Sequence, residues 1–245
     1  MAYIIDLAGQ VAVITGGSKG IGAAIAEVLA KAGAQVVIDD ILNINDAKQT
    51  LESIEKVGPK PLYLQYDISS KKKAFQMAND VVNSFGKIDI LINNAGVVAN
   101  WDTSWNVHVK GAYYCAEAVK PHMTQEGGRI INIISASIFT GGTGIPEYVA
   151  SKGGVYALTL YLARHYAPLG ILVNGIAPAV IKSDMLMTRY KDEQELNEHY
   201  IPQIPIRRIG YPIDVARVAL FLASELSSFI CGEIIIVDGG RMKVG

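Results

Sequence analysis

Short apolar runs alternate with longer segments of helical periodicity along the whole chain. Several runs are apolar at consecutive positions, which is typical of parallel strands covered by helices on both faces. The expected strands are Val11–Thr15, Gln35–Ile38, Leu62–Tyr66, Ile88–Ile92, Arg129–Ile134, Ile171–Ile176 and Glu233–Val237. The expected helices are Ile21–Ala32, Asp46–Val57, Ser70–Phe85, Val107–Met123, Tyr148–Ala167 and Ile213–Ala223. This alternation predicts an α/β fold with a doubly wound parallel sheet of about seven strands, in one domain over residues 1–245.

One long stretch, Lys182–Gly210, has no clear place in this alternation. It carries Pro202 and Pro205, and its middle, Met185–Tyr200, has a composition compatible with helix. A loop of this length inside a compact domain is usually functional. Because the stretch follows a strand end, where α/β sheets bind ligands, we expect it to be a substrate lid.

Composition and charge narrow the function classes. Half of the 245 residues are hydrophobic, which is enough for one substantial core. There are 22 Lys and Arg against 23 Asp and Glu, for a net charge of −1. This balance gives no electrostatic reason to expect nucleic acid as a partner, and we interpret the short basic run Lys71–Lys73 as solvated surface.

The two cysteines, Cys115 and Cys231, have neither the spacing of metal ligands nor the number of a disulfide framework. The first residues carry an acid where a signal peptide has a basic region. No apolar run approaches the roughly 20 residues that span a bilayer. We therefore expect a cytoplasmic protein with no metal and no membrane partner.

The first expected strand runs into a glycine-rich turn, Thr15-Gly16-Gly17-Ser18-Lys19-Gly20-Ile21-Gly22, which opens a helix. Gly16 allows a tight turn, Gly20 lets the backbone approach a pyrophosphate, and Gly22 permits close packing of helix on strand. The helix N-terminus adds free N–H groups for the anion. Glycine-rich turns also serve as plain connections, but this position favours a dinucleotide site in a Rossmann-type sheet.

The second expected strand is followed by two acids, Asp39 and Asp40. An acid at that end accepts hydrogen bonds from the adenosine ribose and repels a 2′-phosphate, although it could instead cap a helix. Lys19 acts in the opposite direction, because a base beside the glycine turn can bind a 2′-phosphate. With two carboxylates against one amine, NAD is favoured over NADP.

Three residues form a candidate catalytic group. Tyr148 and Lys152 lie four apart at the start of an expected helix, on one face. A free tyrosine has a pKa of about 10, but a nearby ammonium and an oxidised nicotinamide would favour its phenolate. Ser135 closes an expected strand at the edge of the sheet where the site should lie. Each residue alone could be ordinary surface or turn; the combination predicts acid–base chemistry.

Together these motifs resemble the short-chain dehydrogenase/reductase family over essentially the whole chain. The resemblance is carried, in this order, by Thr15–Gly22, Asn93-Asn94-Ala95-Gly96, Ser135 with Tyr148-Val-Ala-Ser-Lys152, Asn174-Gly-Ile-Ala-Pro178 and Val237-Asp-Gly-Gly240. It implies that Tyr148 is the acid and base, and that Lys152 lowers the tyrosine pKa and holds the nicotinamide ribose. It also implies that Ser135 polarises the substrate oxygen.

The cofactor-binding residues of the glycine turn are Gly16, Ser18, Lys19, Gly20, Ile21 and Gly22. The resemblance implies further cofactor contacts outside this turn. Asp40 would hold the adenosine ribose, Asp67 and Ile68 the adenine, and Asn94 the backbone near the ribose. Ile181 would donate its amide to the nicotinamide carboxamide. The implied assembly is a homotetramer built on the two long helices 107–123 and 148–167 and on the C-terminal segment.

Two positions depart from the family pattern. His108 stands where the family usually has an asparagine whose backbone binds a proton-relaying water. Three interpretations are open: the backbone keeps that role, the ring relays protons itself with a pKa near neutrality, or turnover is impaired. The stretch from Gly96 to His108 is also shorter than usual. The second departure is mild, with Ala179 after Pro178 where glycine is common.

The sequence thus predicts an NAD-preferring oxidoreductase of a small secondary alcohol, ketone or polyol. The expected substrate walls are residues 138–147, 101–105 and 182–210, which contain Phe139, Trp101, Trp105, Met185, Met187 and Tyr190. These walls have few charges, so we expect no polyanionic substrate. One alternative is a 3-oxoacyl-[acyl-carrier-protein] reductase using NADPH, and another is a nucleotide-binding sensor without catalysis.

Overall fold

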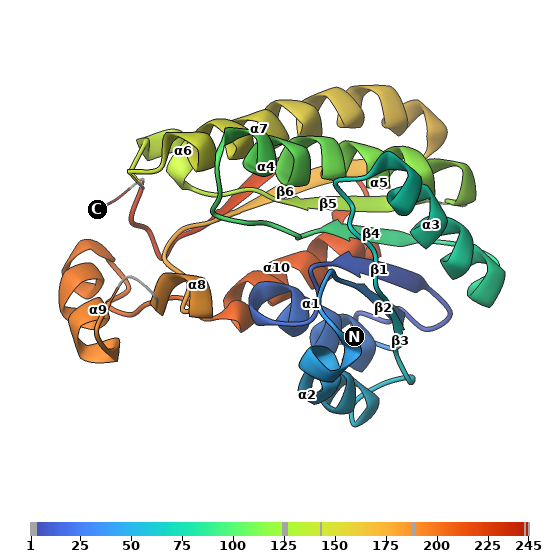
Figure 1. The fold of residues 1–245 in the computed structure, drawn as a ribbon, viewed down its shortest axis with the longest axis horizontal. Helices are drawn as coiled ribbons and strands as arrows, with labels where there is room; N and C mark the ends of the chain where they lie inside the picture. Colours follow the sequence, from blue (N-terminus) through green and yellow to red (C-terminus); the bar gives the residue numbers. More distant parts are fainter. Residues whose placement is uncertain (1–3, 124–126, 143, 188–189, 243, 245) are drawn as a thin grey trace.

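The computed structural model describes residues 4–123, 127–142, 144–187, 190–242 and 244; the side chains of Asp184 and Met185 lie outside this description. Within it, seven strands form one parallel sheet in the order β3-β2-β1-β4-β5-β6-β7 (Figure 1). The strands are β1 (Val11–Thr15), β2 (Gln35–Asp39), β3 (Leu62–Leu64), β4 (Ile90–Asn93), β5 (Arg129–Ile133), β6 (Leu172–Pro178) and β7 (Ile234–Val237). The predicted fold class is confirmed.

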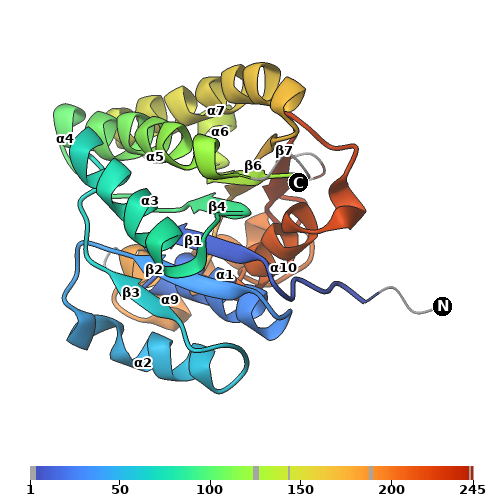
Figure 2. The same ribbon diagram turned by 90° about the vertical axis from the view of Figure 1, so that its right-hand side faces the viewer.

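The helices lie on both faces of the sheet, as its consecutive apolar strands require. They are α1 (Gly20–Lys31), α2 (Ile44–Glu55), α3 (Lys71–Phe85), α4 (Trp101–Trp105), α5 (Ala112–Val119), α6 (Ser137–Thr140), α7 (Pro146–Tyr166), α8 (Asp184–Met187), α9 (Glu193–Tyr200) and α10 (Pro212–Ala223). Short 3₁₀ turns are η2 (Lys120–His122), η3 (Ala167–Leu169), η4 (Ile201–Gln203) and η5 (Glu225–Ser227). Figures 1 and 2 show α1, α2 and α10 on one face and α3, α5 and α7 on the other.

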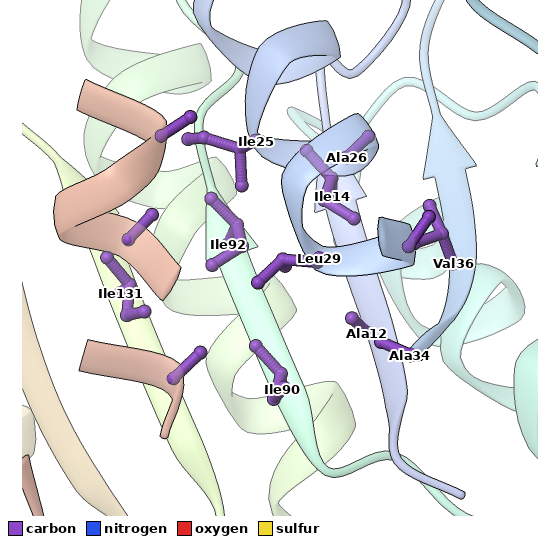
Figure 3. Packing of buried hydrophobic residues seen from close by; sticks show 14 of the residues in the cluster. Ala12, Ile14, Ile25, Ala26, Leu29, Ala34, Val36, Ile90, Ile92 and Ile131 are labelled. Carbon is purple, nitrogen blue, oxygen red and sulfur yellow. The ribbon is translucent and has the colours of Figure 1, made fainter. Parts of the chain in front are cut away.

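Each face of the sheet has its own core. On one face, α1 and α10 pack on the strands, and Ile25 and Leu29 of α1 lie over Ile14, Ile90 and Ile92 (Figure 3). On the other face, apolar side chains of α3, α5 and α7 cover the opposite sides of the same strands. A third, smaller cluster joins Val180 to the 182–210 segment and has no member in the sheet itself.

The order of the strands fixes where a ligand can bind. The chain builds outward from β1 to β3 on one side, then crosses to β4 and builds outward to β7 on the other. The connections after β1 and after β4 therefore leave in opposite directions. This is the switch point at which parallel α/β sheets bind ligands beyond the carboxyl ends of their strands.

Two predicted elements differ from the structure for identifiable reasons. The strand predicted as 62–66 ends at Leu64, because the Tyr66 amide donates to the Asp39 carboxylate at 3.1 Å and not to the sheet. The helix predicted as Val107–Met123 begins at Trp101, where Asn100 caps it by accepting the Thr103 amide. It runs through a π-helical turn, η1 (Asn106–Gly111), into α5.

The helix predicted within Met185–Tyr200 is two helices. Glu193 begins the second one, because the preceding Asp192 accepts a hydrogen bond from the Glu195 amide at 2.9 Å and caps it. Figure 1 shows α8 and α9 beside one end of the sheet. No helix in the described part of the chain combines the length and the apolar character needed to cross a bilayer.

Candidate active site

A cleft of about 1250 Å³ lies along the carboxyl ends of the strands. Gly16 lines it after β1, Asn94 after β4, Ser135 after β5 and Ala179 after β6. Pockets for one small ligand typically measure about 300–1,000 Å³. The cleft is therefore large enough for a dinucleotide together with a small substrate.

The glycine turn at one end of the cleft fits a pyrophosphate. Gly16 and Gly20 have positive φ values of 62° and 58°, and a Cβ at Gly20 would meet no atom within 4 Å. The backbone there is open to a ligand, and Lys19, Gly20 and Ile21 line the cleft. Because α1 begins at Gly20, its first amides have no partner within the helix and can bind an anion.

Two residues of the turn lie behind it and do not line the cleft. A Cβ at Gly22 would lie 2.4 Å from the Gly16 carbonyl oxygen, so this helix can pack on the turn only with glycine there. Ser18 is buried; its amide donates to Asp40 at 3.1 Å, and its hydroxyl has no hydrogen-bond partner among the described residues. Both were predicted among the cofactor-binding residues, Gly22 through close packing of the helix, and in the structure both support the turn from behind.

Asp39 and Asp40 have different environments. The Asp40 carboxylate lines the cleft and accepts the amides of Ser18 at 3.1 Å and Leu42 at 3.2 Å. Asp39 is 1% exposed; burial raises its pKa to about 8, and the charges of Asp40 and Asp67 act in the same direction. Burial thus favours the neutral form of Asp39 near pH 7, which leaves Asp40 as the main carboxylate to weigh against Lys19.

The remaining predicted cofactor residues all line the cleft: Asp67, Ile68, Asn94 and Ile181. The Asn94 side chain donates to the carbonyls of Thr15 at 3.0 Å and Gly16 at 2.8 Å, which ties the end of β4 to the glycine turn. Ile181 forms a parallel bridge with Gly210 through the carbonyl of Val180 and the amide of Lys182. Its own amide points away from that bridge.

The three candidate catalytic residues converge on the same cleft. Lys152 is 4% exposed, and its Nζ donates to the Ile133 carbonyl at 2.8 Å; burial lowers its pKa to about 8. Its Nζ lies 6.0 Å from the centre of the Tyr148 ring, as the four-residue spacing on α7 predicts. The Ser135 hydroxyl lies 2.9 Å from that of Ser137 and accepts the Ser137 amide at 3.2 Å.

His108 is a buried connector between the loop after β4 and α7. Its Nε2 accepts the Val97 amide at 2.9 Å, so the ring proton is on Nδ1, which donates to the Ser151 hydroxyl at 2.8 Å. Ser151 in turn donates to the Tyr148 carbonyl at 3.0 Å, and the His108 and Tyr148 rings meet edge to face at 5.6 Å. Burial lowers the pKa of His108 to about 3, and the Lys152 charge acts in the same direction.

A second cavity, of about 10 Å³, lies directly behind the catalytic residues. His108, Lys152 and Asn93 are among the residues that line it, and the buried Oδ1 of Asn93 has no partner among the described residues. The volume corresponds to about one water molecule. The π-helical turn that contains His108 forms part of this wall; such turns are frequent at functional sites.

All three predicted wall ranges reach the cleft, through Thr103, Thr140 and Tyr200 respectively, but most of the large side chains expected there do not. Tyr190 lines the cleft, but Phe139, Trp101 and Trp105 do not. Phe139 packs against Tyr156 of α7, and the two tryptophans are 55% and 42% exposed. Met187 packs in the small cluster of the 182–210 segment, and the Met185 side chain lies outside the described residues.

Sequence reasoning missed several residues of the substrate side. Outside the predicted wall ranges, the cleft is also lined there by Ser137, Arg241 and Met242. Only Ser137 carried a signal, because it lies two residues after Ser135 on the same turn. Among the described residues there is no group of three or more His, Cys, Asp or Glu that could hold a metal ion.

Comparisons with known proteins agree with this geometry. A family model described as "Enoyl-(Acyl carrier protein) reductase" matches residues 16–241. The 3-oxoacyl-[acyl-carrier-protein] reductase FabG of Aquifex aeolicus is 37% identical, with 96% of this chain and 98% of that protein covered. The 2-dehydro-3-deoxy-D-gluconate 5-dehydrogenase of Dickeya dadantii is 36% identical, with 96% of each covered.

A solved structure of an NAD⁺-bound xylitol dehydrogenase superposes with a TM-score of 0.89 at 29% identity, covering 95% of this chain and 99% of that one. The family match, the relatives and the sheet order agree over nearly the whole chain. The chain therefore belongs to the short-chain dehydrogenase/reductase family, whose members are oxidoreductases of alcohol and carbonyl groups with a nicotinamide cofactor.

Proposed function

We propose that this protein is an NAD(H)-dependent oxidoreductase of a small secondary alcohol, ketone or polyol. The observation that carries the proposal is that Ser135, Tyr148 and Lys152 line one cleft with the glycine turn. A phenol, a buried ammonium and a hydroxyl thus face the space where a coenzyme bound at the turn would extend. The combination provides proton transfer and orientation of a substrate oxygen.

In the proposed reaction, Tyr148 takes the proton of the substrate hydroxyl during oxidation and returns it during reduction. Bound nicotinamide supplies the hydride acceptor or donor. Ser135 donates a hydrogen bond to the substrate oxygen, and its own orientation is fixed by Ser137. A positioned acid–base group of this kind contributes typically about 10²–10⁴-fold to the rate.

Lys152 favours the phenolate form of Tyr148 through its positive charge. Its position is fixed by the Ile133 carbonyl, so the ammonium reaches the site without a flexible approach. Burial lowers the Lys152 pKa to about 8, so the side chain remains mostly charged at neutral pH. A group that titrates just above neutrality is also suited to exchanging protons with a water.

We assign His108 a positioning role. A ring whose Nε2 accepts the Val97 amide has no vacant nitrogen for a second proton, which argues against relay through the ring. The proposed proton path from Lys152 instead uses a water in the small cavity beside Asn93 and His108. This corresponds to the first of the three interpretations, in which the backbone region keeps the relay role.

NAD is the proposed coenzyme. The Asp40 carboxylate is held at the end of β2 by two backbone amides and faces the cleft, where a 2′-phosphate would meet its charge. Lys19 also lines this end of the cleft, but its side chain has no described contact that would direct it toward a phosphate. Repulsion by a fixed carboxylate therefore outweighs attraction by an exposed, flexible amine.

Replacing Tyr148 by Phe tests the catalytic proposal. We expect Tyr148→Phe to bind NADH as the wild type does and to lose about 10²–10⁴-fold in turnover of secondary alcohols followed at the NADH absorbance. The matched control is Tyr156→Phe on the same helix, whose ring packs against Phe139 outside the cleft and should leave turnover unchanged. Equal activity of wild type and Tyr148→Phe would favour the alternative of a nucleotide-binding sensor.

Reduction of an acetoacetyl thioester with NADPH tests the main alternative, which the 37% identity to FabG of Aquifex aeolicus supports. We expect kcat/KM to be higher with NADH than with NADPH by about a hundredfold, and Asp40→Ser to narrow that ratio. Asp46→Asn, an equal change of charge on α2, is the control. A strong NADPH preference with efficient thioester reduction would overturn the NAD assignment.

Two further parts of the proposal concern assembly and access. The 182–210 segment walls one side of the cleft through Leu186, Tyr190 and Tyr200, which supports its role as a substrate lid. Exposed apolar side chains on α5 and α7, among them Tyr113, Leu160 and Tyr161, support a homotetramer that uses these helices. Sedimentation analysis tests the assembly directly.

A further inference from the structure

Arg241 places a positive charge on the substrate side of the cleft, the part walled by residues 182–210 and by the turn after β7. Its Nη2 donates to the Gln203 side-chain oxygen at 2.7 Å, and its guanidinium carbon lies 5.3 Å from the centre of the Tyr200 ring. A guanidinium has five N–H donors. Among the described side chains no Asp or Glu forms an ion pair with it.

The backbone that carries Arg241 is fixed. The Asp238 carboxylate accepts the amides of Gly240 at 2.8 Å and Met242 at 2.7 Å, which closes a tight turn directly after β7. The Gly239 carbonyl accepts the Ile206 amide, so the turn is tied to the 182–210 segment. A guanidinium held at both its backbone and its side chain is preorganised for a ligand, which lowers the entropy lost on binding.

The charged groups of the cleft lie mostly elsewhere, and the nearby Asp238 carboxylate is engaged by two backbone amides of its own turn. Asp39, Asp40, Asp67 and Lys19 line the coenzyme end of the cleft, and Lys152 lies beside Tyr148. The described residues around Arg241 are instead apolar or amide side chains: Leu186, Tyr190, Tyr200, Gln203 and Met242. A half-buried guanidinium on the wall of a cleft can bind an anion there through charge-assisted hydrogen bonds.

We propose that Arg241 binds a carboxylate of the substrate, which makes the substrates hydroxy acids and the corresponding oxo acids. The inference rests on the proposed function and narrows its substrate class. The planar guanidinium matches a carboxylate through two parallel hydrogen bonds. Arg241 is the one cation among the described residues of this wall that line the cleft, and it matches one negative charge. The adjoining Leu186 and Met242 suit a short apolar chain between the carboxylate and the reacting carbon.

The competing explanation is that Arg241 only fastens the 182–210 segment through Gln203 and Tyr200. The two roles differ in what they do to matched substrates. Fastening affects every substrate alike, whereas carboxylate binding affects acids and spares their uncharged counterparts.

The test compares three hydroxy acids of increasing length with their primary amides: 3-hydroxybutanoate, 4-hydroxypentanoate and 5-hydroxyhexanoate. Oxidation with NAD is measured for the wild type, Arg241→Gln, Arg241→Lys and the control Arg207→Gln. Arg207 is exposed, contacts the Pro202 carbonyl and does not line the cleft. Thermal melting of each variant verifies that it is folded.

We expect at least one acid to exceed its amide by tenfold or more in kcat/KM with the wild type. Charge-assisted hydrogen bonds are worth about ten- to a hundredfold in binding. Arg241→Gln should therefore raise KM for that acid by about this factor. Its kcat for the acid, and its kcat and KM for the matching amide, should stay within about twofold of the wild-type values. Arg241→Lys should retain part of the preference, and Arg207→Gln should change neither substrate.

Equal use of acid and amide by the wild type would overturn the inference, as would an equal loss for both in Arg241→Gln. In either case Tyr148-dependent oxidation of the amides would leave the proposed function standing. If no acid, amide or neutral secondary alcohol is oxidised at all, the proposed function fails, and the inference that rests on it fails with it.

Discussion

The two walls of the cleft are held by different parts of the molecule. The coenzyme wall, formed by the glycine turn and the ends of β2 and β4, stands on the two cores that cover the sheet. The 182–210 segment stands on a separate cluster of Val180, Leu196, Ile204 and Ile209. The comparison indicates that coenzyme binding depends on the stability of the whole fold, whereas the substrate side can loosen or change by itself.

A matched pair of core truncations tests whether the 182–210 segment unfolds independently of the sheet. Leu29 on α1 and Leu196 on α9 are both 0% exposed but belong to different clusters. Leu29→Ala should lower the free energy of global unfolding by about 2–5 kcal/mol. Leu196→Ala should instead lower the hydrogen-exchange protection factors of the α9 amides. The free energy of global unfolding should change much less. Equal shifts in both variants would show that the segment unfolds together with the sheet.

The coenzyme wall also contains a buried carboxyl group, Asp39, whose ionisation destabilises the fold. Burial raises the pKa of Asp39 from 3.8 to about 8. Between pH 4 and pH 8 the unfolded chain therefore releases this proton while the folded protein keeps it. The free energy of unfolding should fall as pH rises through this window, by at most about 1.4 kcal/mol per pH unit, and level off above pH 8.

Asp39→Asn tests that prediction, because an amide keeps the shape of the side chain without the ionisation. Urea unfolding at several pH values should show that the free energy of unfolding of the variant increases relative to that of the wild type as pH rises from 4 to 8. Asp46→Asn, on the exposed side of α2, should show no such gain. A wild-type slope unchanged by Asp39→Asn would mean that this carboxyl is ionised in the folded protein.

The smallest expected effect concerns two helix caps, one on α2 at the coenzyme side and one on α9 in the 182–210 segment. Asn43 caps α2 by accepting the Asn45 amide at 3.0 Å, and Asp192 caps α9 by accepting the Glu195 amide at 2.9 Å. Replacing either by alanine should cost about 1 kcal/mol. We expect Asn43→Ala to lower the melting temperature and Asp192→Ala to act on substrate KM with little change in melting.

The sequence predicted the coenzyme wall well because its signals are local. A strand, a glycine turn and a helix start within a few residues of one another, and Asp40 follows the next strand directly. Tyr148 and Lys152 share a helix face by their spacing alone, and the structure has both on the wall of the cleft. Periodicity also located the sheet strands to within a few residues.

The ranges that form the substrate wall were predicted, but the side chains that reach the cleft were not, because these side chains meet only through tertiary packing. Arg241, Gln203 and Tyr200 come from a turn, a 3₁₀ turn and a helix with no shared periodicity. Trp101 and Trp105 were expected in the wall, but Trp101 is largely exposed and the Trp105 ring packs beside Gly154 of α7. The π-helical turn after them shifts the phase of the helix, which no pattern of apolar residues indicated.

The bridge between Ile181 and Gly210 has a consequence for how this architecture can diversify. The bridge joins the two ends of the 182–210 segment at the carboxyl edge of the sheet. The chain therefore leaves β6 and enters α10 at fixed positions, whatever the length of the segment between them. The entropy of closing such a segment grows only slowly with its length. A change of length between these two residues should therefore cost little, provided that the contacts of Ile206 and Gln203 with the turn after β7 are kept.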